Sequence, residues 1–162
     1  MNLLHCVLYL ALIGALGFLV GRMIPPGWVD PERGLWCCFS FEQQGRIYEK
    51  LEIRRWQKKV PDMSRLLPRV MPPKRLAGRD LQCLPEMVRE TCVAELIHWL
   101  LCLGGLYCLR LWRGVGGAVI AVLNICGNLP FILIQRYNRP RLKRLLRRSL
   151  QAQPKEKLLC VP

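Results

Sequence analysis

The chain has few residues that could build a metal site or a familiar catalytic motif. Its 162 residues include two histidines, His5 and His98, and nine cysteines without a C-x-x-C pair, so no zinc cluster is expected. There is also no G-x-S-x-G elbow, no Walker loop and no dinucleotide fingerprint. The sequence therefore lacks the signatures of zinc, nucleotide-binding and α/β-hydrolase enzymes.

Acidic residues are scarce as well. Eleven Asp and Glu stand against 25 Lys and Arg, which gives a net charge of +14. A protein with this much positive charge is expected to bind either nucleic acid or an anionic membrane surface. No nucleic-acid reading motif is present and the basic stretches adjoin hydrophobic segments, so membrane lipids are the expected partner and nucleic acid is not.

The apolar residues are gathered in three blocks, at about 3–20, 93–109 and 115–134. Each block is close to the roughly 20 residues that a helix needs to cross a bilayer, and in lipid only a helix satisfies its own backbone. The sequence predicts an all-α membrane protein with three transmembrane helices, forming a single integral membrane domain over residues 1–162.

The first block could instead be a cleaved signal peptide. It lacks a basic n-region, and no small-residue cleavage site precedes Gly21-Arg22, so a retained anchor is the preferred interpretation.

Positive charge is distributed unevenly around these blocks. Fourteen Lys and Arg residues lie in the loop 21–92, two in the turn between the second and third blocks, and nine in the tail 136–162. The positive-inside rule then predicts a multi-pass protein of the cell membrane, with the N-terminus outside and the loop and C-terminus in the cytoplasm.

The loop and the tail carry their own helix signals. Ser40 with Gln43 predicts a capping box opening a basic amphipathic helix over about 41–60, lying along the membrane interface or packed on the rest of the loop. Residues 63–80 look irregular because of their prolines and glycine. Pro85 predicts the start of a helix that continues through the second block, and residues 141–150 predict a second interfacial helix.

The most informative polar residues lie at the edge of the membrane blocks. Thr91, Glu95, His98 and Cys102 share one helix face, and His98 lies roughly 7 Å beyond Val93 at 1.5 Å per residue. Asn128 reaches a similar depth from the other side. A histidine beside a carboxylate can act as a general base, while an amide or arginine can stabilise an oxyanion.

Two alternatives to catalysis remain open for these residues. Asn, Thr and His can hold transmembrane helices together without doing chemistry. Glu95-x-x-His98 could also ligate a metal, but carboxylate bundles need that motif twice and it occurs once, so no metal is predicted.

Three strings of residues resemble a known family. They are Glu90-Thr91-Cys92-Val93-Ala94-Glu95-Leu96-Ile97-His98-Trp99, Asn128-Leu129-Pro130 and Gln135-Arg136-Tyr137-Asn138-Arg139-Pro140-Arg141-Leu142, preceded by Trp56 and Asp62. In order and spacing they are similar to the glycosyl-4,4'-diaponeurosporenoate acyltransferase family, over about residues 35–148. One departure is Gln57, where the family often has lysine.

The resemblance implies a membrane acyltransferase that esterifies the sugar of a glycosylated carotenoid acid, the last step of a staphyloxanthin-type pathway. The resemblance maps family residues onto eleven positions: Trp56, Asp62, Glu90, Glu95, His98, Asn128, Arg136, Tyr137, Asn138, Arg139 and Arg141. Their roles are our own inference: we expect His98, Glu95 and Asn128 to be catalytic and the other eight to bind substrate.

From these residues we expect the following mechanism. His98 is the general base and Glu95 orients it, Asn128 and Arg136 polarise a thioester carbonyl, and Arg139 and Arg141 hold phosphate or headgroup. No bound cofactor is expected. The co-substrate is an acyl thioester (acyl-CoA or acyl carrier protein), and the acceptor a glycosylated isoprenoid or other glycolipid. A non-catalytic membrane partner, a lipid carrier and a homodimer remain open.

Overall fold

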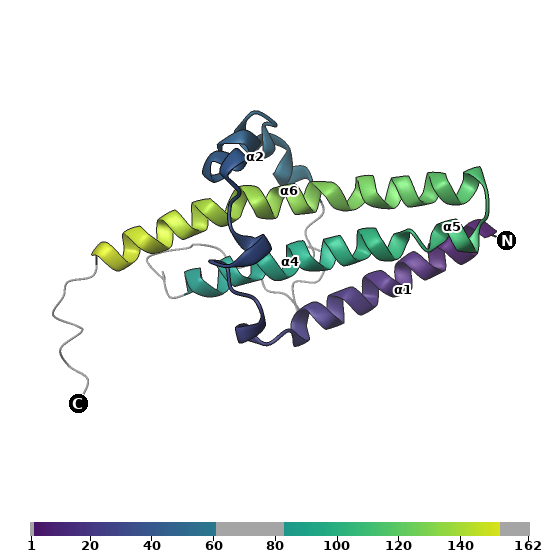
Figure 1. Cartoon of the computed structure of the whole chain (residues 1–162), viewed down its shortest axis with the longest axis horizontal. Coiled ribbons are helices and arrows are strands. Elements are labelled where there is room, and N and C mark those ends of the chain that lie inside the picture. The colour runs from purple at the N-terminus through teal and green to yellow at the C-terminus, as the bar shows by residue number, and fades with distance from the viewer. Residues whose placement is uncertain (1, 61–82, 153–162) are drawn as a thin grey trace.

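The structure is a computed structural model that describes residues 2–60 and 83–152. Within those two ranges every regular element is a helix. The long ones are α1 (Asn2–Met23), α4 (Leu84–Gly105) and α6 (Val115–Ala152), and the short α5 (Cys108–Leu111) lies in the connection between α4 and α6 (Figure 1). Asp62, the stretch 63–80 and the end of the basic tail lie outside the described residues.

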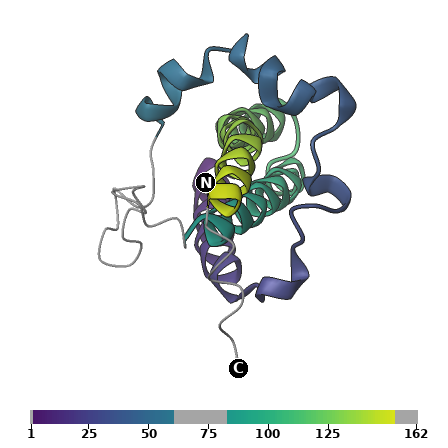
Figure 2. The same cartoon turned by 90° about the vertical axis from the view of Figure 1, so that its left-hand side faces the viewer.

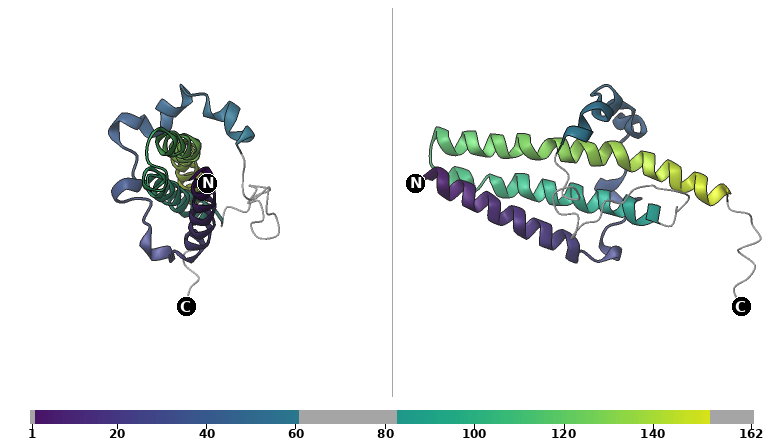
Figure 3. Two further views of the ribbon diagram at one scale, coloured as in Figure 1. Left: turned by 90° about the vertical axis from the view of Figure 1, so that its right-hand side faces the viewer. Right: turned by 180° about the vertical axis from the view of Figure 1, so that it is seen from behind.

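The prediction of three membrane helices is confirmed in length and composition. Three helical segments are long and apolar enough to cross a membrane: Asn2–Met23, Leu84–Leu111 and Val115–Gln151. The leucines and valines of α1 are largely exposed, as expected for a helix whose surroundings are lipid. The three helices run side by side (Figure 3).

Small residues let α1 approach α4. A Cβ added to Gly17 or Gly21 would lie 3.2 or 3.3 Å from the Ile97 side chain, so the helices touch closely at both glycines. Further along, the Tyr9 hydroxyl donates to the Gly104 carbonyl at 2.9 Å. Close backbone approach at small residues is how helices associate in lipid, where the hydrophobic effect does not drive packing.

The start of α4 follows its sequence signals. Pro85 occupies the first turn, where a missing N–H costs nothing, and Glu86 lies near the positive end of the helix dipole. The helix continues without a break into the second hydrophobic block, as predicted. It ends at Gly105, before the predicted end at 109, and a turn through Tyr107 leads into α5.

Residues 141–150 are helical as predicted, but the expectation that they form a helix of their own is wrong. α6 runs 38 residues from the third hydrophobic block into the basic tail, with Pro130 and Pro140 inside it. A proline removes one hydrogen bond of the helix ladder, but contacts at Arg139 and at Pro140 itself hold this turn of α6 in place. Arg139 is anchored on α4, and Gly45 packs against the Pro140 ring.

The predicted amphipathic helix over 41–60 is also wrong. The loop instead folds into short helical turns: η1 (Pro26–Trp28), η2 (Gly34–Trp36), η3 (Ser40–Glu49), α2 (Ile53–Trp56) and η4 (Gln57–Lys59). Positive φ angles at Gln43 (47°), Gly45 (91°) and Glu52 (48°) interrupt a continuous helix. Tertiary packing has overridden the local helix preference.

This loop wraps around the bundle. From the end of α1 it passes alongside α4 and over α6 (Figure 2). It is held by Tyr48 and Ile53, which pack with Tyr137 of α6. At Gly45 an added Cβ would lie 2.9 Å from Cγ of Pro140, so only glycine allows the loop to come this close. The loop is thereby positioned over the middle of the α4–α6 pair.

Candidate functional site

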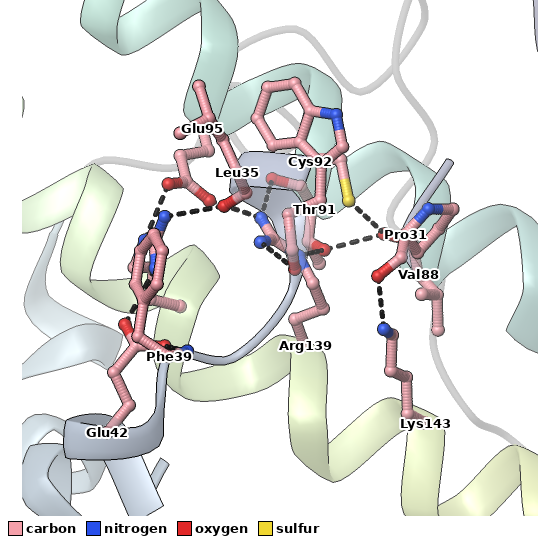
Figure 4. Close-up of polar contacts among 12 residues, drawn as sticks. Pro31, Leu35, Phe39, Glu42, Val88, Thr91, Cys92, Glu95, Arg139 and Lys143 are labelled. Atoms are coloured by element: carbon pink, nitrogen blue, oxygen red, sulfur yellow. Dashed lines mark hydrogen bonds and ion pairs between the residues drawn. The ribbon is translucent and has the colours of Figure 1, made fainter. Parts of the chain in front are cut away.

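A buried charge cluster joins α4, α6 and the loop. Nε of Arg136 donates to one carboxylate oxygen of Glu95 at 2.7 Å, and Nη2 of Arg139 donates to the other at 2.5 Å. Glu95 is 1% exposed and Arg139 is 2% exposed. Both oxygens of one carboxylate are thus shared between two guanidinium groups, as Figure 4 shows for Glu95 and Arg139.

The remaining donors of Arg139 are directed inward. They bond to the Thr91 hydroxyl at 2.9 Å, the Thr91 carbonyl at 3.1 Å and the Trp36 carbonyl at 3.1 Å. The Trp36 ring lies 5.9 Å from the guanidinium. Because its donors are spent on the protein, Arg139 joins α4, α6 and η2 and is not free to bind a ligand.

Arg136 is occupied in the same way. Besides Glu95 it bonds to Glu42 at 2.8 Å and to the Leu35 carbonyl at 2.8 Å, and it lies 4.8 Å from the centre of the Phe39 ring. Sequence reasoning missed Glu42, whose one signal was an acidic side chain within a basic loop. With Glu42 included, the cluster has two acids and two arginines and is neutral.

Glu42 also holds the loop in shape. It is 2% exposed, accepts the Phe39 N–H at 2.8 Å and accepts the Tyr48 hydroxyl. Burial and this hydrogen bond to Glu42 raise the pKa of Tyr48. The capping interaction at the start of η3 therefore comes from Glu42, and not from the predicted Ser40–Gln43 box.

One helical turn further into the membrane-crossing segment, His98 pairs with Asn128. Nδ1 of His98 lies 2.8 Å from Oδ1 of Asn128, across the interface between α4 and α6. Nδ2 of Asn128 donates to the Asn124 carbonyl at 2.9 Å, and Nδ2 of Asn124 donates to the Leu101 carbonyl at 3.0 Å. The His98 ring stacks on Phe131, with centroids 4.6 Å apart and planes 10° from parallel.

This chain of bonds fixes the tautomer of the neutral ring. The Asn124 carbonyl can only accept, so the amide nitrogen of Asn128 faces it and Oδ1 faces His98. Oδ1 also only accepts, so Nδ1 of His98 carries the proton. In the neutral ring Nε2 is then unprotonated and able to take up a proton.

Nε2 is only partly open to the surroundings. No described residue bonds to it, and within the described ranges no buried side-chain nitrogen or oxygen lacks a partner. His98 is half-buried, and Glu95 and Cys102 on the same face of α4 are buried, so Nε2 keeps limited contact with the surroundings at the α4–α6 interface. The pair presents a base at a helix interface that an apolar substrate could reach from the bilayer.

The predicted roles need revision at four residues. Glu95 does not orient His98, because its oxygens belong to Arg136 and Arg139, and Asn128 orients the ring instead. The amide of Asn128 is consumed by His98 and Asn124 and is not available to a thioester carbonyl. Arg136 and Arg139 are likewise bonded within the protein. Glu95 is also not placed as a metal ligand, since arginines surround it.

The remaining predicted residues lie elsewhere on the molecule. Trp56 donates from its ring nitrogen to the Leu51 carbonyl at 2.8 Å and packs at the edge of the Tyr137 cluster. Tyr137 is buried, Asn138 is half-buried and Glu90 is exposed on α4. The predicted substrate-binding residues that the structure describes thus do not form one pocket; Asp62 lies outside the described ranges. Of the basic ones, only Arg141 has a guanidinium that is partly open, at 39% side-chain exposure.

Comparison with known proteins agrees with the resemblance in the sequence. Residues 28–148 match the family model described as glycosyl-4,4'-diaponeurosporenoate acyltransferase. The chain is 32% identical over 133 residues to the protein of that name from Staphylococcus aureus strain MRSA252, and 31% identical to the one from strain N315. In each case the match covers 79% of this chain and 78% of the relative.

No solved structure matches the chain significantly. The charge cluster, the His98–Asn128 pair and the three apolar helices all lie within or adjoin the matched range. The match spans well over half of the chain, and the chain therefore belongs to the glycosyl-4,4'-diaponeurosporenoate acyltransferase family, a family of acyltransferases of carotenoid biosynthesis.

Proposed function

We propose that the protein transfers a fatty acyl chain from a thioester donor to a sugar hydroxyl of a glycosylated carotenoid or a related glycolipid. The family supplies the reaction class and the kind of acceptor. The observation that carries the mechanism is the hydrogen bond between His98 and Asn128, because in the neutral ring it places the proton on Nδ1 and leaves Nε2 as the basic nitrogen.

In this mechanism Nε2 of His98 accepts the proton of the acceptor hydroxyl as its oxygen attacks the thioester carbonyl. The tetrahedral intermediate then collapses, the carbon–sulfur bond breaks, and the leaving sulfur takes the proton from His98. Asn128 holds the ring in the required tautomer throughout, as an orienting group does in serine and cysteine acyl-transfer sites. Ester and free thiol are the products.

The position of His98 fits substrates that stay in the bilayer. It lies on a segment apolar enough to span a membrane, and its neighbours Trp99 and Leu103 are 45% and 63% exposed. An acyl chain and an isoprenoid tail can therefore remain in lipid while their polar ends meet at Nε2. The charge cluster, about one turn away at 1.5 Å per residue, fixes α4 against α6 and thus His98 against Asn128.

We further propose that the N-terminus lies outside the cell and the loop and basic tail lie in the cytoplasm. The N-terminus and the α5–α6 turn are at one end of the bundle, and the end of α6 is at the other (Figure 3). Among the described residues the first end has two basic residues in its turn, Arg110 and Arg113, whereas the part of α6 after Gln135 has seven, which supports this orientation under the positive-inside rule. Impermeant thiol reagents applied to intact cells test it, because labelling of Cys38 from outside would contradict the proposal.

Lipid mass spectrometry on cells that make the acceptor tests the reaction. The comparison, at equal protein levels, includes wild-type protein, His98→Ala and Asn128→Ala. His5→Ala is the control, because it removes the other histidine, which is exposed on α1. Loss of a general base costs on the order of 10² to 10⁴ in rate. We expect the acylated glycolipid to disappear in His98→Ala, to fall in Asn128→Ala and to persist in His5→Ala.

Purified protein with an acyl thioester and the acceptor then separates catalysis from the alternatives. Full transfer activity in His98→Ala would refute the mechanism. Stoichiometric binding of acceptor without turnover would indicate a lipid carrier, and loss of product only on charge reversal in the tail would indicate a non-catalytic partner.

A further inference from the structure

A small polar hollow lies on the side of α6 that faces the loop. It has a volume of about 270 Å³ and is lined by Glu49, Ile53, Arg54, Tyr137 and Arg141, from η3, α2 and α6. We propose that this hollow binds a phosphate group through Arg54 and Arg141. The phosphate belongs either to a phospholipid headgroup or to a coenzyme A thioester, and only the second case rests on the function proposed above.

The two arginines have guanidinium N–H groups that are available to a ligand, whereas the N–H groups of Arg136 and Arg139 in the charge cluster are bonded within the protein. Arg141 is 39% exposed in its side chain, bonds to the Tyr137 hydroxyl and lies 4.5 Å from the centre of that ring. Arg54 is exposed and forms no ion pair or hydrogen bond with the residues that the structure describes. A planar guanidinium fork with free N–H groups matches the oxygens of a phosphate.

The acid in the hollow does not neutralise it. Glu49 lies 3.7 Å from Arg141, which is long for an ion pair, and its side chain is 57% exposed. The lining therefore has two positive charges against one negative charge that can swing into solvent. Isolated exposed pairs of this kind contribute little, so an incoming phosphate can replace Glu49 as the partner of Arg141.

A second hollow, of about 310 Å³, provides a useful contrast. Its two cations are Arg89, paired with Glu86 at 2.6 Å, and Lys143, paired with Glu32 at 3.1 Å. Two acids balance two bases there, and each base also reaches a backbone carbonyl. Of these two hollows, the one at Arg54 and Arg141 has a surplus of positive charge.

The phosphate site is separate from the proposed base. Tyr137 follows Asn128 by nine residues, which is two and a half turns at about 3.6 residues per turn, so the two side chains leave α6 on opposite faces. Asn128 faces α4 and His98, whereas Tyr137 faces Tyr48 and Ile53 of the loop. A bound phosphate would therefore fix the loop against α6 without touching His98.

Native mass spectrometry of the full-length protein in detergent tests the site, because it counts retained ligands without requiring turnover. One arm adds phosphatidylglycerol, with zwitterionic phosphatidylcholine for comparison, and the other adds coenzyme A. We expect Arg54→Gln and Arg141→Gln each to weaken retention on the order of tenfold and Glu49→Gln to strengthen it. Lys50→Gln, which removes an exposed neighbouring charge outside the hollow, should retain wild-type binding.

The arms distinguish the two sources of phosphate. If the protein retains phosphatidylglycerol and coenzyme A does not displace it, the hollow binds a phospholipid headgroup. If coenzyme A displaces the lipid, the hollow binds the phosphate of the coenzyme A donor. His98→Ala should leave binding unchanged in either case, so failure of the proposed chemistry does not affect this result. If Arg54→Gln, Arg141→Gln and Glu49→Gln all bind like Lys50→Gln, the proposal is overturned, and misfolding cannot imitate the opposite effects of the arginine and glutamate substitutions.

Discussion

The charge cluster makes a quantitative prediction about stability. Glu42, Glu95, Arg136 and Arg139 sum to zero charge, and their side chains are between 1% and 13% exposed. Glu95→Gln leaves one surplus positive charge in this cluster, and it turns amide N–H groups toward arginine donors. Removing one partner from a buried pair costs about 3–5 kcal/mol, so we expect a loss of that size in the free energy of unfolding.

The double variant is the informative one. Arg139→Gln alone leaves a surplus negative charge, whereas Glu95→Gln together with Arg139→Gln restores neutrality. The double variant should therefore be more stable than the sum of the single losses predicts, by roughly 1–3 kcal/mol. Glu86→Gln serves as the control, because its pair with Arg89 has a similar distance, 2.6 Å, but Glu86 is 43% exposed, and such pairs contribute at most about 1 kcal/mol.

Unfolding by stepwise addition of SDS to mixed micelles measures these energies. Tryptophan fluorescence is a suitable signal, since Trp36 lies 5.9 Å from the Arg139 guanidinium. Two results would contradict the reasoning: strict additivity in the double variant, or a loss for Glu86→Gln as large as that for Glu95→Gln. Either would mean that burial does not set the strength of the cluster.

Three further substitutions or measurements test close contacts. In Gly105→Ala the new Cβ would lie 2.0 Å from Nδ2 of Asn124, and displacing that side chain should lower acyl transfer on the order of a hundredfold, measured on purified protein. Gly45→Ala combines a φ of 91° with a Cβ only 2.9 Å from Cγ of Pro140, so it should lose about 1–3 kcal/mol in the SDS titration. Partial desolvation of the thiol and the nearby Glu42 carboxylate raise the pKa of Cys38, although the residue as a whole is exposed. Because only the thiolate reacts, its maleimide labelling, followed by mass spectrometry, should reach half its maximal rate at a higher pH than free cysteine.

Matched controls exist for each test. Gly14→Ala and Gly127→Ala place a Cβ where nothing lies within 4 Å, so both should keep activity and stability, and alanine within a helix should stabilise slightly. Full activity in Gly105→Ala would mean that Asn124 does not help to position His98. Labelling of Cys38 with the pH profile of free cysteine would mean that its surroundings do not disfavour the thiolate.

The sequence predicted some elements well because their causes are local. An apolar block in lipid must bond its own backbone groups and therefore forms a helix whatever its neighbours are. Pro85 and Glu86 likewise mark the start of α4 independently of what the helix packs against. The sequence also singled out the polar residues His98, Asn128 and Glu95, because polar side chains are rare and costly within such blocks, and their role in a functional site stays a prediction.

The errors in prediction have tertiary causes. Glu95 and His98 share a helix face and were expected to interact, but two arginines from α6 bind the carboxylate more strongly than a neutral imidazole would. The helix over 41–60 is broken because Glu42 turns inward to Arg136 and Gly45 packs on Pro140. Neither partner could be identified from the loop alone, since each is more than 90 residues away in the chain.

The sequence by itself determined the helical class, the three apolar segments, the family resemblance and most of the polar residues at the site. These follow from composition and short-range pattern, which act within one helix. Only the tertiary structure decided which polar groups pair: Glu95 with Arg136 and Arg139, and His98 with Asn128. Pairing depends on the rotation and depth of α6 relative to α4, and buried polar groups must find a partner there, so the packing of the two helices assigns the roles that the residue types leave open.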